Sequence, residues 1–144
     1  MASKRTSNEF VVETTRTLPK KSVQGLLVSA FEGGSNYWYG ALDYDFGDSG
    51  LTLADFRKGG SMTDPDDYFH PCQIVPFAEG CAVTLEVQGE PGRERLDLDA
   101  IKRGLERMAL TAPEHFNNID GPSEDATTGD VFLQCCLFGE VIFG

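Results

Sequence analysis

VFLQCCLF, residues 131–138, is apolar on almost every side, and this stretch does most to decide the fold. A helix that is hydrophobic all round is buried inside a protein rather than laid on its surface. Ser123 is the expected N-cap of this helix, and Glu124 and Asp125 follow it near the positive end of the helix dipole. The sequence therefore predicts a buried helix that runs through residues 131–138.

Two polar residues interrupt the apolar character of this helix. Asp130 and Gln134 are four positions apart, so both side chains project from one side of it. A polar pair on a buried helix must find hydrogen-bond partners, because unpaired polar groups are costly to bury. We favour the interpretation that the pair bonds the backbone of a neighbouring loop or the end of a strand. The alternative is that it forms the polar floor of a pocket.

A second helix is predicted just before the first. Its apolar residues recur at helical spacing: Leu98, Ile101, Leu105, Met108 and Ala109. Asp97 is the candidate N-cap, and Pro113 ends the run. Gly104 lies inside this helix, where glycine costs about 1 kcal/mol relative to alanine. Its presence there indicates close packing against a neighbouring element.

The N-terminal half of the sequence predicts strands. Residues 22–31 are apolar on both alternating faces, which is typical of a central strand buried on both sides. Residues 37–46 alternate with period two and predict a strand with one wet face. Residues 51–56 form a short strand candidate, and residues 72–77 and 81–88 are expected to pair as a hairpin.

Together these elements predict an α+β domain: an antiparallel sheet of about five strands with two C-terminal helices packed on one face. Residues 1–21 form a polar, partly basic arm, and residues 22–144 a single domain. Residues 57–71 are expected to form a long loop, and residues 139–144 a last strand or a docked tail.

The charge balance limits the partners of this protein. Twelve Lys and Arg residues face 23 Asp and Glu residues, which gives a net charge of -11. Such a surface repels phosphates, so direct binding of DNA or RNA is disfavoured. An acidic surface also fits a basic groove on a nucleic-acid-binding protein, although solubility alone accounts for the charge. The sequence has no apolar run of membrane-spanning length and no secretory signal, so we expect a cytoplasmic protein.

Signatures of catalysis and of metal binding are weak. The four cysteines include no C-x-x-C pair, and with two histidines in the chain we expect no metal site and no cofactor. We interpret all four cysteines as structural. The sequence contains no nucleophile elbow, so no catalytic residue is assigned. Pairs of carboxylates can be drawn among several acids, which leaves a metal-dependent enzyme as the third hypothesis.

FEGGSNYWYG, residues 31–40, is the other conspicuous stretch. A phosphate loop is excluded there, because a strand is expected after the glycines and no lysine is near. We favour a hairpin turn at residues 32–36, with the glycines at positive φ. The alternative is the rim of a binding site, in which amide, carboxylate and aromatic groups gather. The side chains of that rim are Glu32, Asn36, Tyr37 and Trp38.

EGGSNYWYG and DATTGDVFLQCCLFGEVIFG together resemble a family of small proteins from bacteriophages and prophages. Its members pair a Glu-Gly-Gly…Tyr-Trp segment with an Asp-Ala…Asp…Gln…Phe-Gly-Glu…Gly ending. The resemblance covers these two stretches and, loosely, the helix before the second. The matching positions are Glu32, Gly33, Gly34, Tyr37, Trp38, Asp125, Asp130, Gln134, Gly139 and Glu140. The family has no established activity, so the resemblance implies a phage context, in an infected or lysogenic bacterial host.

Three hypotheses about function follow, with the most favoured first. The protein is an anti-defence inhibitor, similar to anti-CRISPR proteins, whose acidic surface engages a basic groove of a host nucleic-acid-handling protein. Alternatively, it sequesters a nucleotide-like small molecule; the third hypothesis is the metal-dependent enzyme. The candidate ligand- or partner-binding residues are Glu32, Asn36, Tyr37, Trp38, Asp130 and Gln134. A homo-oligomer is possible, with the Tyr-Trp-Tyr strand or the last helix as its natural interface.

Overall fold

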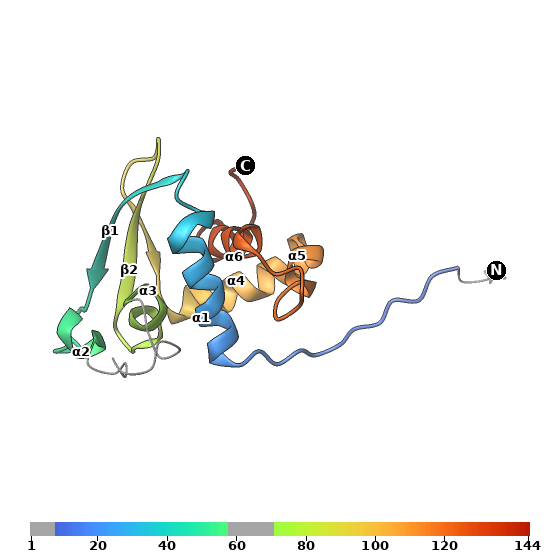
Figure 1. Cartoon of the computed structure of the whole chain (residues 1–144), viewed down its shortest axis with the longest axis horizontal. Coiled ribbons are helices and arrows are strands. Elements are labelled where there is room, and N and C mark those ends of the chain that lie inside the picture. The colour runs from blue at the N-terminus through green and yellow to red at the C-terminus, as the bar shows by residue number, and fades with distance from the viewer. Residues whose placement is uncertain (1–7, 58–70) are drawn as a thin grey trace, which may run out of the picture.

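A three-stranded antiparallel sheet lies beside a group of helices in the computed structural model, which describes residues 8–57 and 71–144 (Figure 1). The strands lie in chain order: β1 (Tyr39–Asp45), β2 (Ala82–Val87) and β3 (Arg93–Leu96). The α+β class predicted from the sequence is confirmed. The expected number of about five strands is wrong, because the described sheet has three.

Helices take up most of the remaining described chain. They are α1 (Lys20–Ser29), α2 (Leu53–Arg57), α3 (Pro71–Ile74), α4 (Leu98–Thr111), α5 (Pro113–Asn117) and α6 (Ala126–Phe138). A π-helical turn, η1 (Ala30–Gly34), continues α1, and a short 3-10 turn, η3 (Val75–Phe77), continues α3. Among the residues described, no helix has the length and apolar character needed to cross a lipid bilayer.

The strand predicted at residues 22–31 is wrong, because this segment forms α1 and the start of η1. Its buried apolar residues, Val23, Leu26, Leu27 and Ala30, follow the i, i+3, i+4, i+7 spacing of a helix. A short run with apolar residues on both faces is compatible with a buried strand and with a buried helix, so the sequence pattern alone does not distinguish them. Packing against α6 selects the helix.

The strand candidates at residues 51–56 and 72–77 are also helical. Residues 53–57 form α2, whose first turn is closed by the Asp55 carboxylate, which accepts from Thr52 N at 2.7 Å. Residues 71–77 form α3 and η3. Because residues 72–77 are helical, they do not form the predicted hairpin with residues 81–88. Strand β2 pairs with β1 and β3 instead. Strand β3 is mostly polar and was not predicted.

Strands β1 and β2 confirm the predictions for residues 37–46 and 81–88. Leu42 lies opposite Leu85 and Tyr44 opposite Val83, so these four side chains share the face turned to the core. The other face carries charges: Arg93 of β3 pairs with Asp43 at 3.2 Å across the sheet. The long loop expected at residues 57–71 falls largely on residues 58–70, which lie outside the described residues.

Helix α6 is the buried centre of the helical group, as its apolar sequence predicts, and it packs against α1 and α4. Two glycines permit these close approaches. A Cβ at Gly129 would lie 2.7 Å from the Leu26 carbonyl oxygen of α1. A Cβ at Gly104 of α4 would lie 2.7 Å from Cys136 Cα of α6, which confirms the close packing expected at Gly104.

The capping predictions for the two C-terminal helices have different outcomes. Asp97 caps α4 as expected, since its carboxylate accepts from Ala100 N at 2.9 Å. Helix α6 is capped by Asp125, not by the expected Ser123. Asp125 and Thr128 form a reciprocal capping box, which satisfies two backbone N–H groups at once. Both helices contact β3, and the short helix α5 between them was not predicted.

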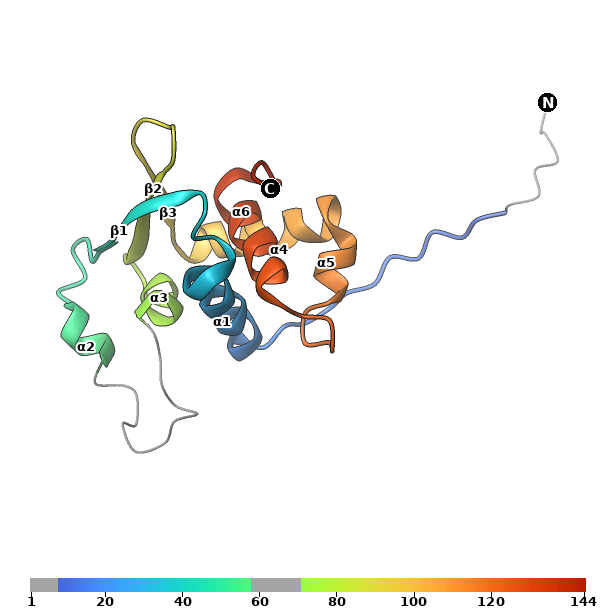
Figure 2. The same cartoon turned by 45° about the horizontal axis from the view of Figure 1, so that its top comes forward.

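The two ends of the described chain behave differently. Residues 8–19 have no regular structure and run away from the domain (Figures 1 and 2). Helix α1 begins at Lys20, within the segment assigned to the arm. Residues 139–144 form a docked tail without strand structure, which decides between the two interpretations left open for this segment.

Candidate functional site

The glycines of FEGGSNYWYG end a helix and do not make the predicted hairpin turn. They close η1, and neither has the positive φ that the hairpin interpretation required. Glycine is needed at position 34 because there is no room for a side chain. A Cβ there would meet the Ala126 carbonyl oxygen at the start of α6. The close approach at Gly34 therefore brings the next residues, which begin at Ser35, beside α6.

A buried carboxylate joins this segment to α6. Asp130 Oδ1 accepts from Ser35 Oγ at 2.8 Å and from Trp38 Nε1 at 2.7 Å. Asp130 Oδ2 accepts from the Tyr37 hydroxyl at 2.6 Å and from Gln134 Nε2 at 3.1 Å. Four donors thus surround one carboxylate, which meets the hydrogen-bonding demand of a buried charge. We call Ser35, Tyr37, Trp38, Asp130 and Gln134 the Asp130 cluster.

Gln134 attaches the C-terminal tail to the same cluster. Its Oε1 accepts from Ile142 N at 2.9 Å and from Phe143 N at 2.8 Å, and its Nε2 donates to Phe143 O at 3.2 Å. The amide thus satisfies backbone groups that no strand or helix would pair. The favoured interpretation, in which the polar pair of α6 bonds the backbone of a neighbouring loop, therefore holds for Gln134 only, because the hydrogen bonds of Asp130 come from side chains.

Trp38 and Tyr37 differ in their access to a ligand. Trp38 is 1% exposed and stacks on Phe143 with ring centroids 5.5 Å apart, so its ring has no free face for a ligand. Tyr37 is 51% exposed. Desolvation, together with the hydrogen bond and the charge of Asp130, raises the pKa of Tyr37 to about 12. The hydroxyl therefore stays protonated and keeps donating to the cluster at neutral pH.

The structure brings together Tyr37, Trp38, Asp130 and Gln134, and leaves the other two candidate residues outside the cluster. Glu32 is exposed on η1. Asn36 is exposed, and its Oδ1 accepts from the Tyr39 hydroxyl at 2.8 Å. Ser35 was not among the predicted site residues, although a hydroxyl between the glycines and the Tyr-Trp pair was a signal for a polar contact.

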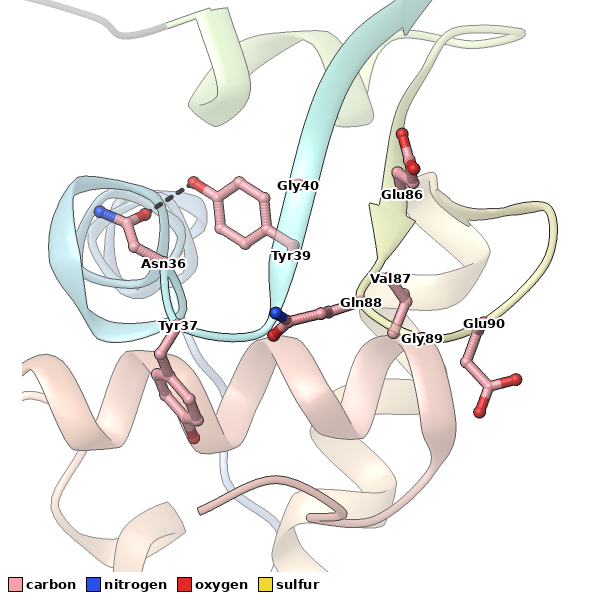
Figure 3. A pocket seen from close by; sticks show the side chains of 9 residues that line it. All are labelled: Asn36, Tyr37, Tyr39, Gly40, Glu86, Val87, Gln88, Gly89 and Glu90. Carbon is pink, nitrogen blue, oxygen red and sulfur yellow. Dashed lines mark hydrogen bonds between the residues drawn. The ribbon is translucent and has the colours of Figure 1, made fainter.

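A shallow pocket opens on the other side of the same segment (Figure 3). We call it the hairpin pocket; its volume is about 470 Å³, and it is lined by Asn36, Tyr37, Tyr39, Gly40, Glu86, Val87, Gln88, Gly89 and Glu90. Figure 3 shows Gln88 extending from the β2–β3 hairpin toward the start of β1, with Glu86 and Glu90 on the hairpin side. The lining holds two carboxylates and two tyrosine rings but no Lys, Arg or His.

The chemistry of this lining suits a positive group. Carboxylates and amide oxygens accept hydrogen bonds from ammonium or guanidinium groups, and tyrosine rings attract cations to their faces. A phosphate would meet two negative charges and no basic side chain. Glu86, Gln88 and Glu90 were not among the predicted site residues, because no local sequence pattern shows that they lie opposite residues 36–40.

The acidic, histidine and cysteine side chains of the described residues bear on metal binding and on nucleophilic chemistry. There, no three His, Cys, Asp or Glu side chains gather in a way that would hold a metal ion. All four cysteines are buried thiols, in agreement with a structural role. Burial raises the pKa of Cys72 to about 11, and it also raises the pKa of Cys135 and Cys136. These three thiols are therefore poor nucleophiles near neutral pH.

No family model, curated protein or solved structure matches this chain.

Proposed function

We propose that this protein is an inhibitor that binds a host protein, and that its hairpin pocket receives a basic side chain of that partner. The observation that carries the proposal is the lining of the pocket, which holds Glu86 and Glu90 together with tyrosines and amides but no basic side chain. Arg93 lies opposite Glu86 in the sheet, but its guanidinium pairs with Asp43. Lys and Arg side chains are the protein groups that such a lining recognises. A nucleic-acid-handling protein presents these side chains in the groove that binds phosphate.

The wider surface supports the same partner class. Among the residues described, ion pairs engage only three carboxylates: Asp43, Asp45 and Asp97. Most of the negative charge of these described residues thus lies outside ion pairs. The negative electrostatic field of such a surface speeds association with a basic surface, and salt weakens this attraction.

The nucleotide-sequestering hypothesis is less well supported by the site. It relied on Trp38 as a stacking platform, and that ring is buried against Phe143. The open pocket nearby offers no positive group to a phosphate. A bound nucleotide would therefore be an alternative result of a capture experiment with this protein.

The resemblance to phage and prophage proteins belongs to the same proposal. Four of the matching positions, Tyr37, Trp38, Asp130 and Gln134, are joined in the Asp130 cluster. We interpret the shared motif as a device that holds η1, α6 and the tail together. The residues that meet the partner then lie at the hairpin pocket, outside the motif. The place of action is the cytoplasm of an infected or lysogenic bacterium.

The experiment is a capture from bacterial lysate with matched charge variants. The test variant is Glu86→Gln with Glu90→Gln, and the control is Asp48→Asn with Glu79→Gln. The control removes the same charge at the opposite end of the sheet, from residues that line a separate hollow. Each protein is tested at about 50 mM and about 500 mM salt, because screening separates charge-driven capture from apolar capture.

The expected result is a captured nucleic-acid-binding protein whose recovery falls at high salt. The test variant should lose it, the control should keep it, and the purified protein should block nucleic-acid binding by that partner. Equal capture by both variants would refute the role of the hairpin pocket. A nucleotide found by mass spectrometry on the purified protein, without any captured partner, would replace the proposal with sequestration.

A further inference from the structure

The C-terminal tail, residues 140–144, is held by side chains alone. Among the described residues, no backbone–backbone hydrogen bond reaches these five residues. Their hydrogen bonds end on two side chains: the Gln134 amide bonds the backbone of Ile142 and Phe143, and the Tyr37 hydroxyl lies 3.2 Å from Phe143 O. Helices and strands are held instead by continuous ladders of backbone bonds. The tail can therefore separate without breaking any helix or strand.

Little of the tail is buried. Phe143 is half-buried and packs against the core, whereas the other four residues of the tail are exposed. The Phe143 ring stacks on Trp38 with centroids 5.5 Å apart and planes 2° apart, and it meets Phe138 edge-on at 5.9 Å. Fixing each residue of the tail costs conformational entropy, while one aromatic ring supplies most of the apolar burial. The tail is therefore held much more weakly than the helices of the core.

Gly139 separates the tail from α6. It is the C-cap of the helix, with a left-handed φ of 78°, and its N–H donates to Cys135 O at 3.0 Å. Arg107 of α4 also donates from Nε to Gly139 O at 2.9 Å. These bonds close the end of α6 before the tail begins, as a glycine C-cap does. In Figure 1 the tail leaves α6 at this point and runs along the outside of the domain. Gly139 is thus placed as a hinge.

The Trp38 ring is positioned without help from the tail. Its Nε1 donates to Asp130 Oδ1 at 2.7 Å, and its backbone oxygen accepts from Gln88 N at 2.9 Å. Its ring also meets Phe138 and Tyr39 edge-on, at 5.4 Å and 5.9 Å between centroids. All of these contacts persist when the tail is lifted. Loss of the tail therefore uncovers one face of the ring and leaves the ring in place.

We propose that residues 140–144 form a strap that opens at Gly139 while the rest of the fold stays closed, and that this opening bares the face of Trp38 that Phe143 covers. The open strap also frees the Gln134 amide, so an aromatic face and a side-chain amide become accessible together. Such local openings belong to segments with few buried apolar contacts. The strap is separate from the carboxylates of the hairpin pocket, so this inference does not rest on the proposed function.

The first test is native-state hydrogen exchange on the unaltered full-length protein. The amides of Ile142 and Phe143 should exchange at least about a hundredfold faster than that of Leu133, which is buried in the middle of α6. Low concentrations of urea should hardly change exchange in the strap, because a local opening exposes little surface, but should accelerate exchange at Leu133. Equal protection and an equal response to urea at all three amides would show that the tail opens only with global unfolding, and would overturn the proposal.

The second test follows Trp38, the single tryptophan of the chain, by acrylamide quenching of its fluorescence. Gln134→Leu removes the amide that holds the strap but keeps Phe143, so a higher quenching constant reports that the strap has opened. We expect a rise of at least about threefold. The matched control is Gln88→Leu, the same chemical change outside the tail, and it should leave quenching unchanged.

Circular dichroism checks that both variants remain folded; if Gln134→Leu does not fold, the hydrogen exchange of the unaltered protein decides. Unchanged quenching in a folded Gln134→Leu protein whose tail amides exchange faster would show that the strap does not gate Trp38. A rise of equal size in both variants would likewise overturn the proposal, because the effect would then not come from the strap.

Discussion

The Asp130 cluster and the hairpin pocket use adjacent residues of one segment in opposite ways. Ser35, Tyr37 and Trp38 give their polar hydrogens to a buried carboxylate. Asn36 and Tyr39 lie on the other side, along an open hollow that also holds Glu86 and Glu90. The cluster is closed by its own partners, whereas the two carboxylates of the pocket have no basic neighbour in its lining.

This difference separates residues that hold the fold from residues available to a partner. In both regions, aromatic, amide and carboxyl groups lie together, which is the composition of a binding site. In the cluster each group is satisfied within the chain, so a substitution there acts on stability. In the hairpin pocket the groups face solvent, and substitutions should act on binding while the fold persists. Four predictions test this contrast.

Asp130→Ala should have the largest effect, a loss of about 3–5 kcal/mol in the free energy of unfolding. It leaves the donors of Ser35 and Trp38 buried without an acceptor. Asp130→Asn is the control, and it should lose less because one carbonyl oxygen remains. Urea denaturation measures both. A loss below about 1 kcal/mol for the alanine variant would show that the cluster does not hold the fold.

Gln134→Leu should cost about 2–3 kcal/mol, because the backbone N–H groups of Ile142 and Phe143 lose their acceptor. Hydrogen exchange of these two amides should become faster, since the tail is no longer held. The matched control is Gln88→Leu in the hairpin pocket, expected to change stability by at most about 0.5 kcal/mol. Unchanged protection of the two amides would refute the role given to Gln134.

Tyr37 belongs to the Asp130 cluster and also lines the hairpin pocket, and its contribution to the stability of the fold should depend on pH. Tyr37→Phe measures this contribution. The folded pKa of Tyr37, about 12, lies above its ordinary value of 10.0, so folding favours the protonated hydroxyl. Its contribution is fully present below pH 10.0 and is lost as the pH rises through about 12. The stability difference between the unaltered protein and Tyr37→Phe should shrink over that window, as measured by denaturant titrations at several pH values. A constant difference would contradict the prediction.

The smallest effect on stability is expected for Glu86→Gln with Glu90→Gln. These exposed carboxylates lie outside the ion pairs of the described chain, so the free energy of unfolding should stay within about 0.5 kcal/mol. Thermal melts alongside Asp48→Asn with Glu79→Gln check this. Destabilisation by more than about 1 kcal/mol in the hairpin variant alone would place these carboxylates among the residues that hold the fold.

The sequence predicted the elements whose periodicity allows one structure. Period two marked β1, residues 81–88 were expected to be one strand of a hairpin and form β2, and helical spacing after an Asp cap marked α4. It failed where the pattern allows two structures, as in residues 22–31, which form α1 and the start of η1. It also missed β3, whose four mostly polar residues become a strand only because β2 lies beside them.

For the candidate site, the sequence selected residues that do meet but could not say what they do there. Tyr37, Trp38, Asp130 and Gln134 were picked for their chemistry, and the fold joins them. Whether such groups bind a ligand or one another depends on burial, which no local pattern contains. The hairpin pocket was missed for a related reason, because its two sides are far apart in the chain.

The sequence by itself determined the acidic charge, the buried helix α6 with its polar pair, the α4 helix and the strands β1 and β2. These properties follow from composition and from repeats of two to four residues. Only the tertiary structure decided that residues 22–31 are mainly helical, that Gly34 provides space for the start of α6, and that Ser35 reaches Asp130 across 95 positions. Such contacts depend on how whole elements pack, because a buried polar group takes whatever partner the fold brings to it.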